Sequence, residues 1–220
     1  IKLMPTLLGI DEAGRGAVVG PLVVAGVLID SKNEQKLKTI GVKDSKLLSA
    51  SRREQLYKKI KQIAKRLFVV ELTAQEIDDK RKLKNLNKIE ADQMAYIIKK
   101  SSADVAVVDT PQVSTEKFKQ YLISLAQNHT SIISENYADK NHPVVSAASI
   151  VAKVTRDSEI EKIKKIVGED FGVGYSHDAR TIDFIKRCLK EKKHLEFIRH
   201  SWITVSDLKG KSKQKELGEF

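Results

Sequence analysis

Short apolar runs rich in β-branched residues recur along this chain, and several of them end in acidic residues. Four acids stand directly after such runs: Asp11, Glu12, Asp109 and Asp139. Runs of this length and composition are typical of buried strands. A carboxylate next to a buried strand is unfavourable unless it finds a partner. The chain is therefore constrained to a sheet whose strand ends gather carboxylates.

The remaining pattern extends this sheet into an alternation of strands and helices. Strands are predicted over Thr6–Ile10, Pro21–Ile29, Phe68–Leu72, Asp104–Asp109 and Ser131–Ala138. Helices are predicted from the N-cap Ser49 to about residue 66, and over residues 85–100, 115–127, 144–167 and 181–193. Neighbouring strands followed by alternating strands and helices indicate an α/β fold, a mixed sheet with helices on its faces.

Positive charge is concentrated in two segments of this basic chain. The net charge is +11, yet residues 36–66 alone hold eleven basic and two acidic residues, and residues 80–100 hold seven and two. Such a concentration favours a polyanionic partner such as nucleic acid. A lysine-rich solvated helix of a heat-adapted protein is the alternative.

Cysteine content and hydropathy exclude two classes of protein. The single cysteine, Cys188, cannot form an internal disulfide, which excludes a disulfide-stapled secreted scaffold. The longest apolar run, Pro21–Ile29, has the length of a strand and is too short for a membrane-spanning helix. We therefore expect a globular, cytoplasmic protein.

The four acids predict a metal site. Carboxyl ends of strands form the ligand crevice of open α/β sheets, and carboxylates gathered there repel one another unless a cation is present. Oxygen ligands suit Mg²⁺ or Mn²⁺, and two such ions are the arrangement for phosphodiester displacement. Adjacent strand residues point to opposite faces, so Asp11 and Glu12 converge only if the strand bends, which the irregular segment 13–16 would allow. Acids that merely cap turns after strands are the common alternative.

An ordered set of motifs resembles the type 2 ribonucleases H. It begins with the segment Gly9–Gly16 (GIDEAGRG) and Gly20-Pro21, and its further parts are Lys43–Leu47 (KDSKL), the Asp109 strand, Ala138-Asp139, Pro143–Asp157, Gly174-Tyr175, Asp178, Arg180-Thr181 and Trp202. The resemblance covers roughly residues 5–205 and is to ribonuclease HII of the archaeal kind. An aspartate as the fourth acid and the lack of an extra N-terminal domain favour this family over the sister ribonucleases HIII.

The resemblance implies a fold, a domain plan and an activity. The fold would be ribonuclease H-like, a five-stranded mixed sheet flanked by helices with a small C-terminal helical extension. The catalytic domain would span residues 1–180, the extension 181–208 and a flexible tail 209–220. The activity would be metal-dependent cleavage of RNA in RNA–DNA hybrids and on the 5′ side of ribonucleotides embedded in duplex DNA, leaving 3′-hydroxyl and 5′-phosphate ends.

The resemblance also assigns site residues. The acids that would bind two Mg²⁺ or Mn²⁺ ions and act in catalysis are Asp11, Glu12, Asp109 and Asp139. The residues that would bind substrate are Gly14, Arg15, Gly16, Lys46, Lys153, Arg156 and Tyr175. Glycine lets the backbone approach a ribose and read its 2′-hydroxyl. Departures from the family pattern at Ala17, Ser176-His177 and Ala179 leave the acids intact.

The last residues carry a second motif. Gln214, Leu217 and Phe220 have the spacing of peptides that bind sliding clamps, in which a short helical turn inserts aliphatic and aromatic side chains into an apolar pocket. We therefore expect the replication clamp, proliferating cell nuclear antigen, as a partner.

Two other functions compete with this prediction. One is a related metal nuclease or strand-transfer enzyme that acts on DNA. The other is a non-catalytic binder of RNA–DNA hybrids that uses only the basic face. A pure binder has no reason to place four acids beside phosphates, which they repel.

Overall fold

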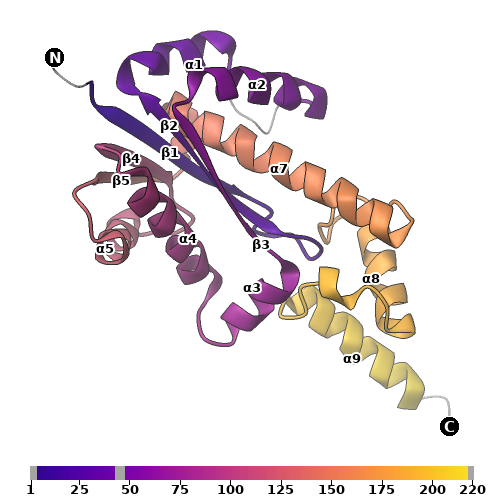
Figure 1. Cartoon of the computed structure of the whole chain (residues 1–220). Coiled ribbons are helices and arrows are strands. Elements are labelled where there is room, and N and C mark those ends of the chain that lie inside the picture. Colours follow the sequence, from indigo (N-terminus) through magenta and orange to yellow (C-terminus); the bar gives the residue numbers. More distant parts are fainter. Residues whose placement is uncertain (1–3, 43–47, 218–220) are drawn as a thin grey trace. The chain divides into compact units, whose positions relative to one another are not determined.

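A computed structural model describes residues 4–42 and 48–217, with backbone only for residues 211–217. Its sheet consists of β1 (Thr6–Ala13), β2 (Leu22–Asp30), β3 (Arg66–Leu72), β4 (Val105–Asp109) and β5 (Ser131–Glu135), in the order β3-β2-β1-β4-β5 (Figure 1). Strand β1 is antiparallel to β2 and parallel to β4, and β4 is parallel to β5. The prediction of a five-stranded mixed sheet is confirmed.

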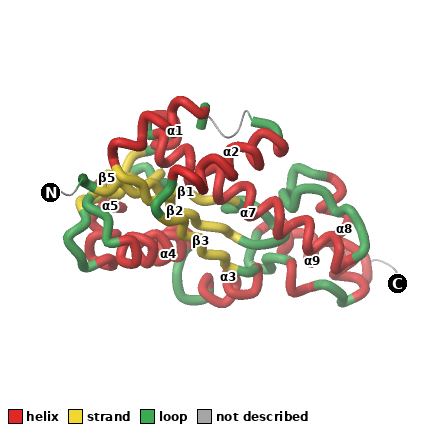
Figure 2. Tube along the Cα trace, turned by 45° about the horizontal axis from the view of Figure 1, so that its top comes forward, coloured by secondary structure: helices red, strands yellow, loops and turns green. Residues whose placement is uncertain are grey.

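Helices connect the strands. The α-helices are α1 (Glu34–Ile40), α2 (Ala50–Ile63), α3 (Ala74–Arg81), α4 (Leu86–Ser101), α5 (Thr115–Ala126), α6 (Ala138–Asn141), α7 (Pro143–Val167), α8 (Ala179–Glu191) and α9 (Ile203–Leu217), and the 3₁₀ helices are η1 (Ser31–Asn33) and η2 (Leu195–Phe197) (Figure 2). Helix α2 begins as predicted, because the Ser49 hydroxyl accepts a hydrogen bond from the Arg52 N–H at 3.2 Å. Among the described residues, no helix combines the length and apolarity needed to span a membrane.

By its internal contacts the chain divides into two compact units. Unit 1 comprises Ile1–Ala13, Val23–Val70 and Asn85–Thr155, and unit 2 comprises Gly14–Leu22, Glu71–Lys84 and Arg156–Phe220. These units are interleaved along the sequence, so they differ from the domain boundary predicted at residue 180. That boundary separates functions and stays a prediction.

Unit 1 buries both faces of the sheet. On one face, Val27 of β2 and Val107 of β4 pack against Leu56 of α2 and Val151 of α7. The other face carries Ile10 of β1 and residues of α4 and α5. Each buried aliphatic side chain contributes about 1.5–3 kcal/mol relative to its exposed state. Because neighbouring strand residues alternate between faces, the α7 face receives the odd-numbered residues of β1 and β4.

Unit 2 has its own core of residues from the 14–22 segment, the end of α7, α8 and α9. Val19, Phe171, Phe184 and Val205 are all buried in it. The Phe171 and Phe184 rings stack with centroids 4.8 Å apart. This core anchors the segment that directly follows β1.

The C-terminal segment has a helical backbone. Residues 209–220 were predicted to form a flexible tail, and their flexibility stays a prediction, while the backbone of α9 is helical through Leu217. Lysine, glutamine, glutamate and leucine are good helix formers, and their helix propensity outweighs the low helix propensity of Gly210. Phe220 lies outside the described residues, as do the side chains of Gln214 and Leu217.

Candidate active site

Two of the four predicted acids lie on one face of the sheet, at the ends of neighbouring strands. Parallel pairing aligns Ile10 of β1 with Val108 of β4. The next residues, Asp11 and Asp109, therefore lie side by side on the α7 face, where Ala13 and Val107 are buried. Asp11 is 6% exposed. The sheet geometry thus brings together two acids that are 98 residues apart in the sequence.

The third acid joins them from a helix. Asp139 was expected at the end of a strand, but β5 ends at Glu135 and Asp139 is buried in the first turn of α6. The chain leaves the strand direction because the Asn136 side chain donates hydrogen bonds to the Thr110 and Gln112 carbonyls, both at 2.8 Å. The Ala138 N–H then donates to Asp109 Oδ1 at 3.0 Å, which fixes the start of α6 beside β4.

Two serines of α7 support these acids, although neither was predicted as a site residue. The Ser149 hydroxyl hydrogen-bonds to the Asp11 carboxylate. Ser146 donates to the main-chain carbonyl of Asp139. Strand and helix can approach this closely because of Gly9, where a Cβ would lie 2.4 Å from the Val144 carbonyl atoms. Two serines three residues apart, on a helix that faces acidic strand ends, form the sequence pattern from which Ser146 and Ser149 could have been predicted as site residues.

Burial and like charge perturb Asp11. Burial raises the pKa of Asp11 to about 7, and the neighbouring Asp109 and Asp139 carboxylates contribute to the rise, while the Ser149 hydroxyl and the Glu12 N–H oppose it. The Glu12 N–H donates to Asp11 Oδ1 at 2.7 Å. A strongly perturbed carboxyl group beside two others is typical of a functional site.

Glu12 stands apart from this group. The strand was expected to end or bend between Asp11 and Glu12, but β1 continues in register through Ala13, opposite Val23. The Glu12 side chain therefore leaves the backbone on the sheet face that carries Leu8 and Ile10, and it is half-buried. Its participation stays a prediction.

The carboxylates of Asp11, Asp109 and Asp139 have the chemistry that binds a divalent cation, although in the described structure they do not form a complete coordination sphere. Among the residues that the structure describes, no three Asp, Glu, His or Cys side chains already surround a common point. Asp139 Oδ1 is nevertheless buried with no hydrogen-bond partner in the described part of the chain. A buried carboxylate oxygen without a donor, next to two like charges, is stabilised by a cation, and oxygen donors alone favour Mg²⁺ or Mn²⁺.

The predicted substrate-binding glycines lie in a turn of unit 2. Gly14 is buried with φ of +86°, and a Cβ there would lie 2.5 Å from Arg156 Nε and 2.6 Å from the Pro21 carbonyl oxygen. Gly16 is exposed, and a Cβ there would meet nothing within 4 Å. Gly14 is therefore required by the turn, whereas Gly16 is not required by any neighbour in the described part of the protein.

Tyr175 and Arg156 form a second group in unit 2. The Arg156 guanidinium lies 4.7 Å from the Tyr175 ring centroid and donates to the Val173 carbonyl at 3.1 Å. Arg156 is 4% exposed, and burial lowers its pKa. Arg156 was predicted to contact phosphate, which stays a prediction, and in the structure its guanidinium lies against the Tyr175 ring. Lys153 is half-buried on α7 in unit 1, and Lys46 lies outside the described residues.

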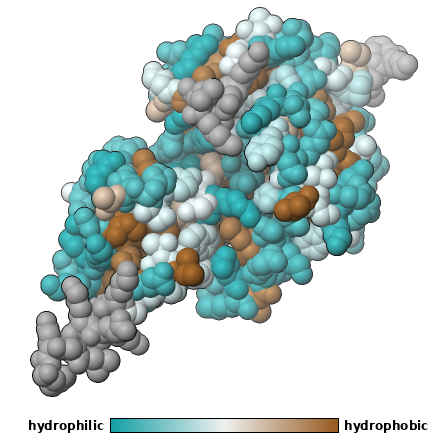
Figure 3. All heavy atoms as spheres, turned by 180° about the vertical axis from the view of Figure 1, so that it is seen from behind, coloured by the Kyte–Doolittle hydropathy of each residue, from teal (hydrophilic) through white to brown (hydrophobic). Residues whose placement is uncertain are grey.

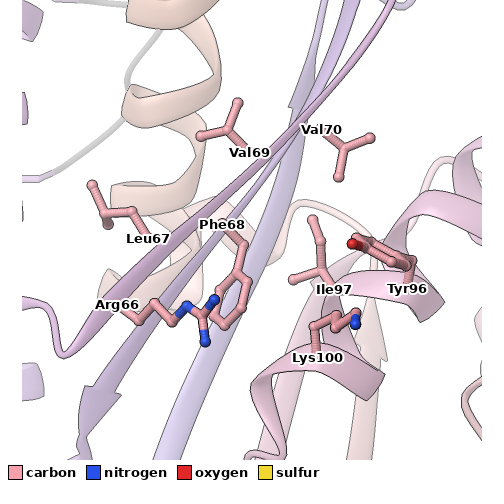
Figure 4. Close-up of a pocket in the computed structure, with 8 residues that line it drawn as sticks. All are labelled: Arg66, Leu67, Phe68, Val69, Val70, Tyr96, Ile97 and Lys100. Carbon is pink, nitrogen blue, oxygen red and sulfur yellow. The ribbon is translucent and has the colours of Figure 1, made fainter.

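A pocket of about 320 Å³ in unit 1 does not coincide with the acids (Figure 4). Its lining residues are Arg66, Leu67, Phe68, Val69, Val70, Tyr96, Ile97 and Lys100. Phe68 and Ile97 belong to the α4 face of the sheet, opposite Asp11, and no lining residue is acidic. The face shown in Figure 3 is mostly hydrophilic with separate apolar spots.

Comparison with known proteins decides the family. The Ribonuclease HII family model matches residues 8–205. This chain belongs to the ribonuclease HII family. The ribonuclease HII of Methanothrix thermoacetophila is 41% identical over 210 residues, which are 95% of this chain and all of that protein.

Two solved ribonuclease HII-type structures share the fold. One is the ribonuclease H2 of Pyrococcus horikoshii, with a TM-score of 0.87, 35% identity and coverage of 95% of this chain and 99% of that one. The other is the ribonuclease HII of Archaeoglobus fulgidus in complex with PCNA, with a TM-score of 0.83, 40% identity and coverage of 92% and 96%. As a ribonuclease HII, the chain is a metal-dependent endonuclease with a ribonuclease H-like fold, as predicted.

Proposed function

We propose that this ribonuclease HII cuts RNA in RNA–DNA hybrids and on the 5′ side of ribonucleotides embedded in duplex DNA, leaving 3′-hydroxyl and 5′-phosphate ends. In this proposal two ions, Mg²⁺ or Mn²⁺, are held by Asp11, Glu12, Asp109 and Asp139. A role in DNA replication and repair, in the cytoplasm, is part of the same proposal.

The convergence of Asp11, Asp109 and Asp139 where β1 and β4 end and α6 begins carries the proposal. Three carboxylates gathered so closely, with the pKa of Asp11 raised by burial and further by the other two, destabilise the fold unless a cation balances their charge. When bound, divalent ions supply an activated water and stabilise the leaving 3′-oxygen, so no covalent nucleophile is needed. The Ser149 hydroxyl and the Glu12 N–H favour the ionised form of Asp11 that a cation requires.

The substrate contacts would come from the segment that directly follows the acids. Exposed Gly16 allows the backbone to approach a ribose, and its N–H can read the 2′-hydroxyl that separates RNA from DNA. Gly14, Arg15, Lys46 and Lys153 would contact the flanking backbone. The Tyr175 ring, stacked on Arg156, offers a flat surface for the sugar.

A duplex that contains one ribonucleotide tests this function. With Mg²⁺ or Mn²⁺ we expect a single cut on the 5′ side of the ribonucleotide, and no cut in the presence of chelator. We expect Asp109→Asn to lower the rate at least about 10³-fold, because it removes a full charge from the metal-binding group. The readout is product length and end chemistry on a denaturing gel.

The same experiment separates the alternatives. Cleavage of the matched all-DNA duplex at a similar rate would favour a DNA nuclease of the same fold. Binding without any cleavage would favour a hybrid-binding protein. Metal-dependent cleavage that persists in Asp109→Asn would overturn the proposed mechanism.

We also propose that the C-terminal residues Gln214, Leu217 and Phe220 bind a sliding clamp. The structure of the Archaeoglobus fulgidus relative in complex with PCNA supports a clamp as partner. The helical backbone through Leu217 suits a motif that binds as a short helical turn.

Removal of residues 214–220 is expected to weaken clamp binding at least about tenfold, because the motif supplies the apolar anchors. Clamp-independent cleavage is expected to stay within about twofold of wild type, a tolerance of about 0.4 kcal/mol in the barrier. The measurement is a titration of fluorescently labelled PCNA. The matched control replaces Lys211, Lys213 and Lys215 by alanine, which removes charge and keeps the motif. Unchanged affinity after truncation would contradict the proposal.

A further inference from the structure

Arg199 has an unusual environment in unit 2. Its side chain is fully buried, at 0% exposure. The guanidinium donates from Nε to the Gly20 carbonyl at 3.0 Å and from Nη1 to the Arg15 carbonyl at 3.1 Å. One guanidinium thus bridges two carbonyls of the turn that contains Gly16, across 179 and 184 residues of sequence.

Main-chain bonds tie the same two segments together. The Arg199 N–H donates to the Val18 carbonyl, and the Gly20 N–H donates to the Phe197 carbonyl, both at 2.9 Å. The following segment is fixed in turn, because Asp78 accepts hydrogen bonds from the His200 and Ser201 N–H groups. These hydrogen bonds therefore fix the backbone from which the Arg199 side chain extends.

The charge of Arg199 is poorly compensated within the protein. Its guanidinium makes no ion pair with a carboxylate among the described residues, and Nη2 is buried without a hydrogen-bond partner there. Burial lowers the pKa of Arg199 to about 9, and the nearby Arg156 cation contributes to the decrease, while Tyr175 and Asp78 oppose it. A buried cation without a paired carboxylate destabilises the folded state. Two buried guanidinium groups around one turn instead favour an anionic ligand at that turn.

Trp202 completes the cluster. Its ring contacts two guanidinium groups, with Arg199 at 4.9 Å and Arg81 at 5.0 Å from the ring centroid. Arg81 is exposed, and within the described part of the chain it shares the ring contact of Arg199 without the carbonyl contacts. Arg81 is therefore a matched control, and Trp202, the only tryptophan of the chain, is a local fluorescent probe.

We infer that Arg199 is a positioning residue for the reaction: its fork holds the Arg15 and Gly20 carbonyls and so sets the path of the backbone at Gly16 that meets the ribose. The inference rests on the proposed function, in which this turn contacts the substrate. Arg199 acts through the turn and does not touch the reacting atoms. A displacement of about 1 Å in such a turn is enough to slow a reaction about 10²-fold.

The test compares Arg199→Lys with Arg81→Lys and the wild type. Lysine keeps the charge but lacks the planar fork that reaches both carbonyls. Because misplacement costs catalysis more than binding, we expect Arg199→Lys to lower kcat on the embedded-ribonucleotide duplex at least about 30-fold, with the Kd for the same duplex in chelator within about threefold of wild type. Arg81→Lys is expected to change neither value more than about twofold, because it makes no bond to the turn. Cooperative denaturant unfolding, followed through Trp202 emission, reports whether each variant keeps its fold.

Each outcome is decisive. If the wild type cleaves and folded Arg199→Lys cleaves within about threefold of it, Arg199 does not position the turn. If Arg199→Lys and Arg199→Gln both lose cooperative unfolding, Arg199 is a structural residue and the inference is overturned. If the wild type itself does not cleave, the proposed function fails rather than this inference.

Discussion

Asp11→Asn is expected to abolish cleavage and, without metal, to make the protein more stable above neutral pH. The activity should fall at least about 10³-fold, because the variant removes a charge that the metal-binding group needs. Asparagine keeps an oxygen that can accept the Glu12 N–H, so the local geometry is preserved. A variant that loses activity while it gains stability cannot be explained as a misfolded protein.

The direction of the stability effect follows from the pKa of Asp11. It lies at about 7 in the folded protein and at 3.8 for an unperturbed aspartate, so the folded state keeps a proton that the unfolded state has released. The wild type therefore loses stability as the pH rises from about 4 to about 7, on the order of 4 kcal/mol in total. The asparagine of the variant does not titrate and avoids this loss.

Denaturant unfolding in chelator, at about pH 5 and about pH 8, measures the effect. We expect the stability difference between Asp11→Asn and wild type to grow with pH, and added Mg²⁺ to stabilise the wild type more than the variant. Asp104→Asn is the matched control, since exposed Asp104 directly precedes β4 at the end of the strand opposite to Asp109. The Thr6 N–H and hydroxyl lower the pKa of Asp104, so its stability effect has the opposite sign, and its removal should leave activity intact. Wild-type activity in Asp11→Asn would refute the metal site.

The strands and the positions of Asp11 and Asp109 could be predicted because their signals are local. An apolar β-branched run ended by an acid is visible in a few residues. Parallel pairing of β1 with β4 then brings the two acids side by side. Asp139 was assigned to a strand end because residues 131–138 include a β-branched apolar pair and an aromatic residue. The strand stops earlier, at Glu135, because of the side-chain bonds of Asn136 to a distant loop, which no local pattern shows.

The role of Arg199 could not be predicted for a related reason. An arginine in a basic chain such as this one is usually a solvated charge. Its burial depends on a turn that lies 179 residues earlier in the sequence. The face of Glu12 was missed because the continuation of β1 depends on pairing with β2, and glycine-rich sequence after Ala13 favours an earlier end.

Gly16→Ala is expected to leave the fold intact and to slow cleavage about 10²-fold, because a methyl group would stand where the backbone meets the ribose. Gly16 is not one of the described glycines with positive φ, and a Cβ there would meet nothing within 4 Å. The free energy of unfolding should therefore stay level or rise by about 0.4–1 kcal/mol, since alanine restricts the unfolded chain. A loss of activity without loss of stability locates Gly16 on the substrate side of the turn.

Two other glycines provide the comparison. Gly14→Ala should lose stability and activity together, since φ of +86° and contacts of 2.5–2.6 Å leave no room for a Cβ. Gly210→Ala in α9 also meets open space and should keep full activity. Kinetics on the embedded-ribonucleotide duplex, together with denaturant unfolding, separate the three variants. Wild-type kcat/KM in folded Gly16→Ala would mean that recognition of the 2′-hydroxyl does not require close approach at this residue, and the substrate contact would have to be reassigned within the turn.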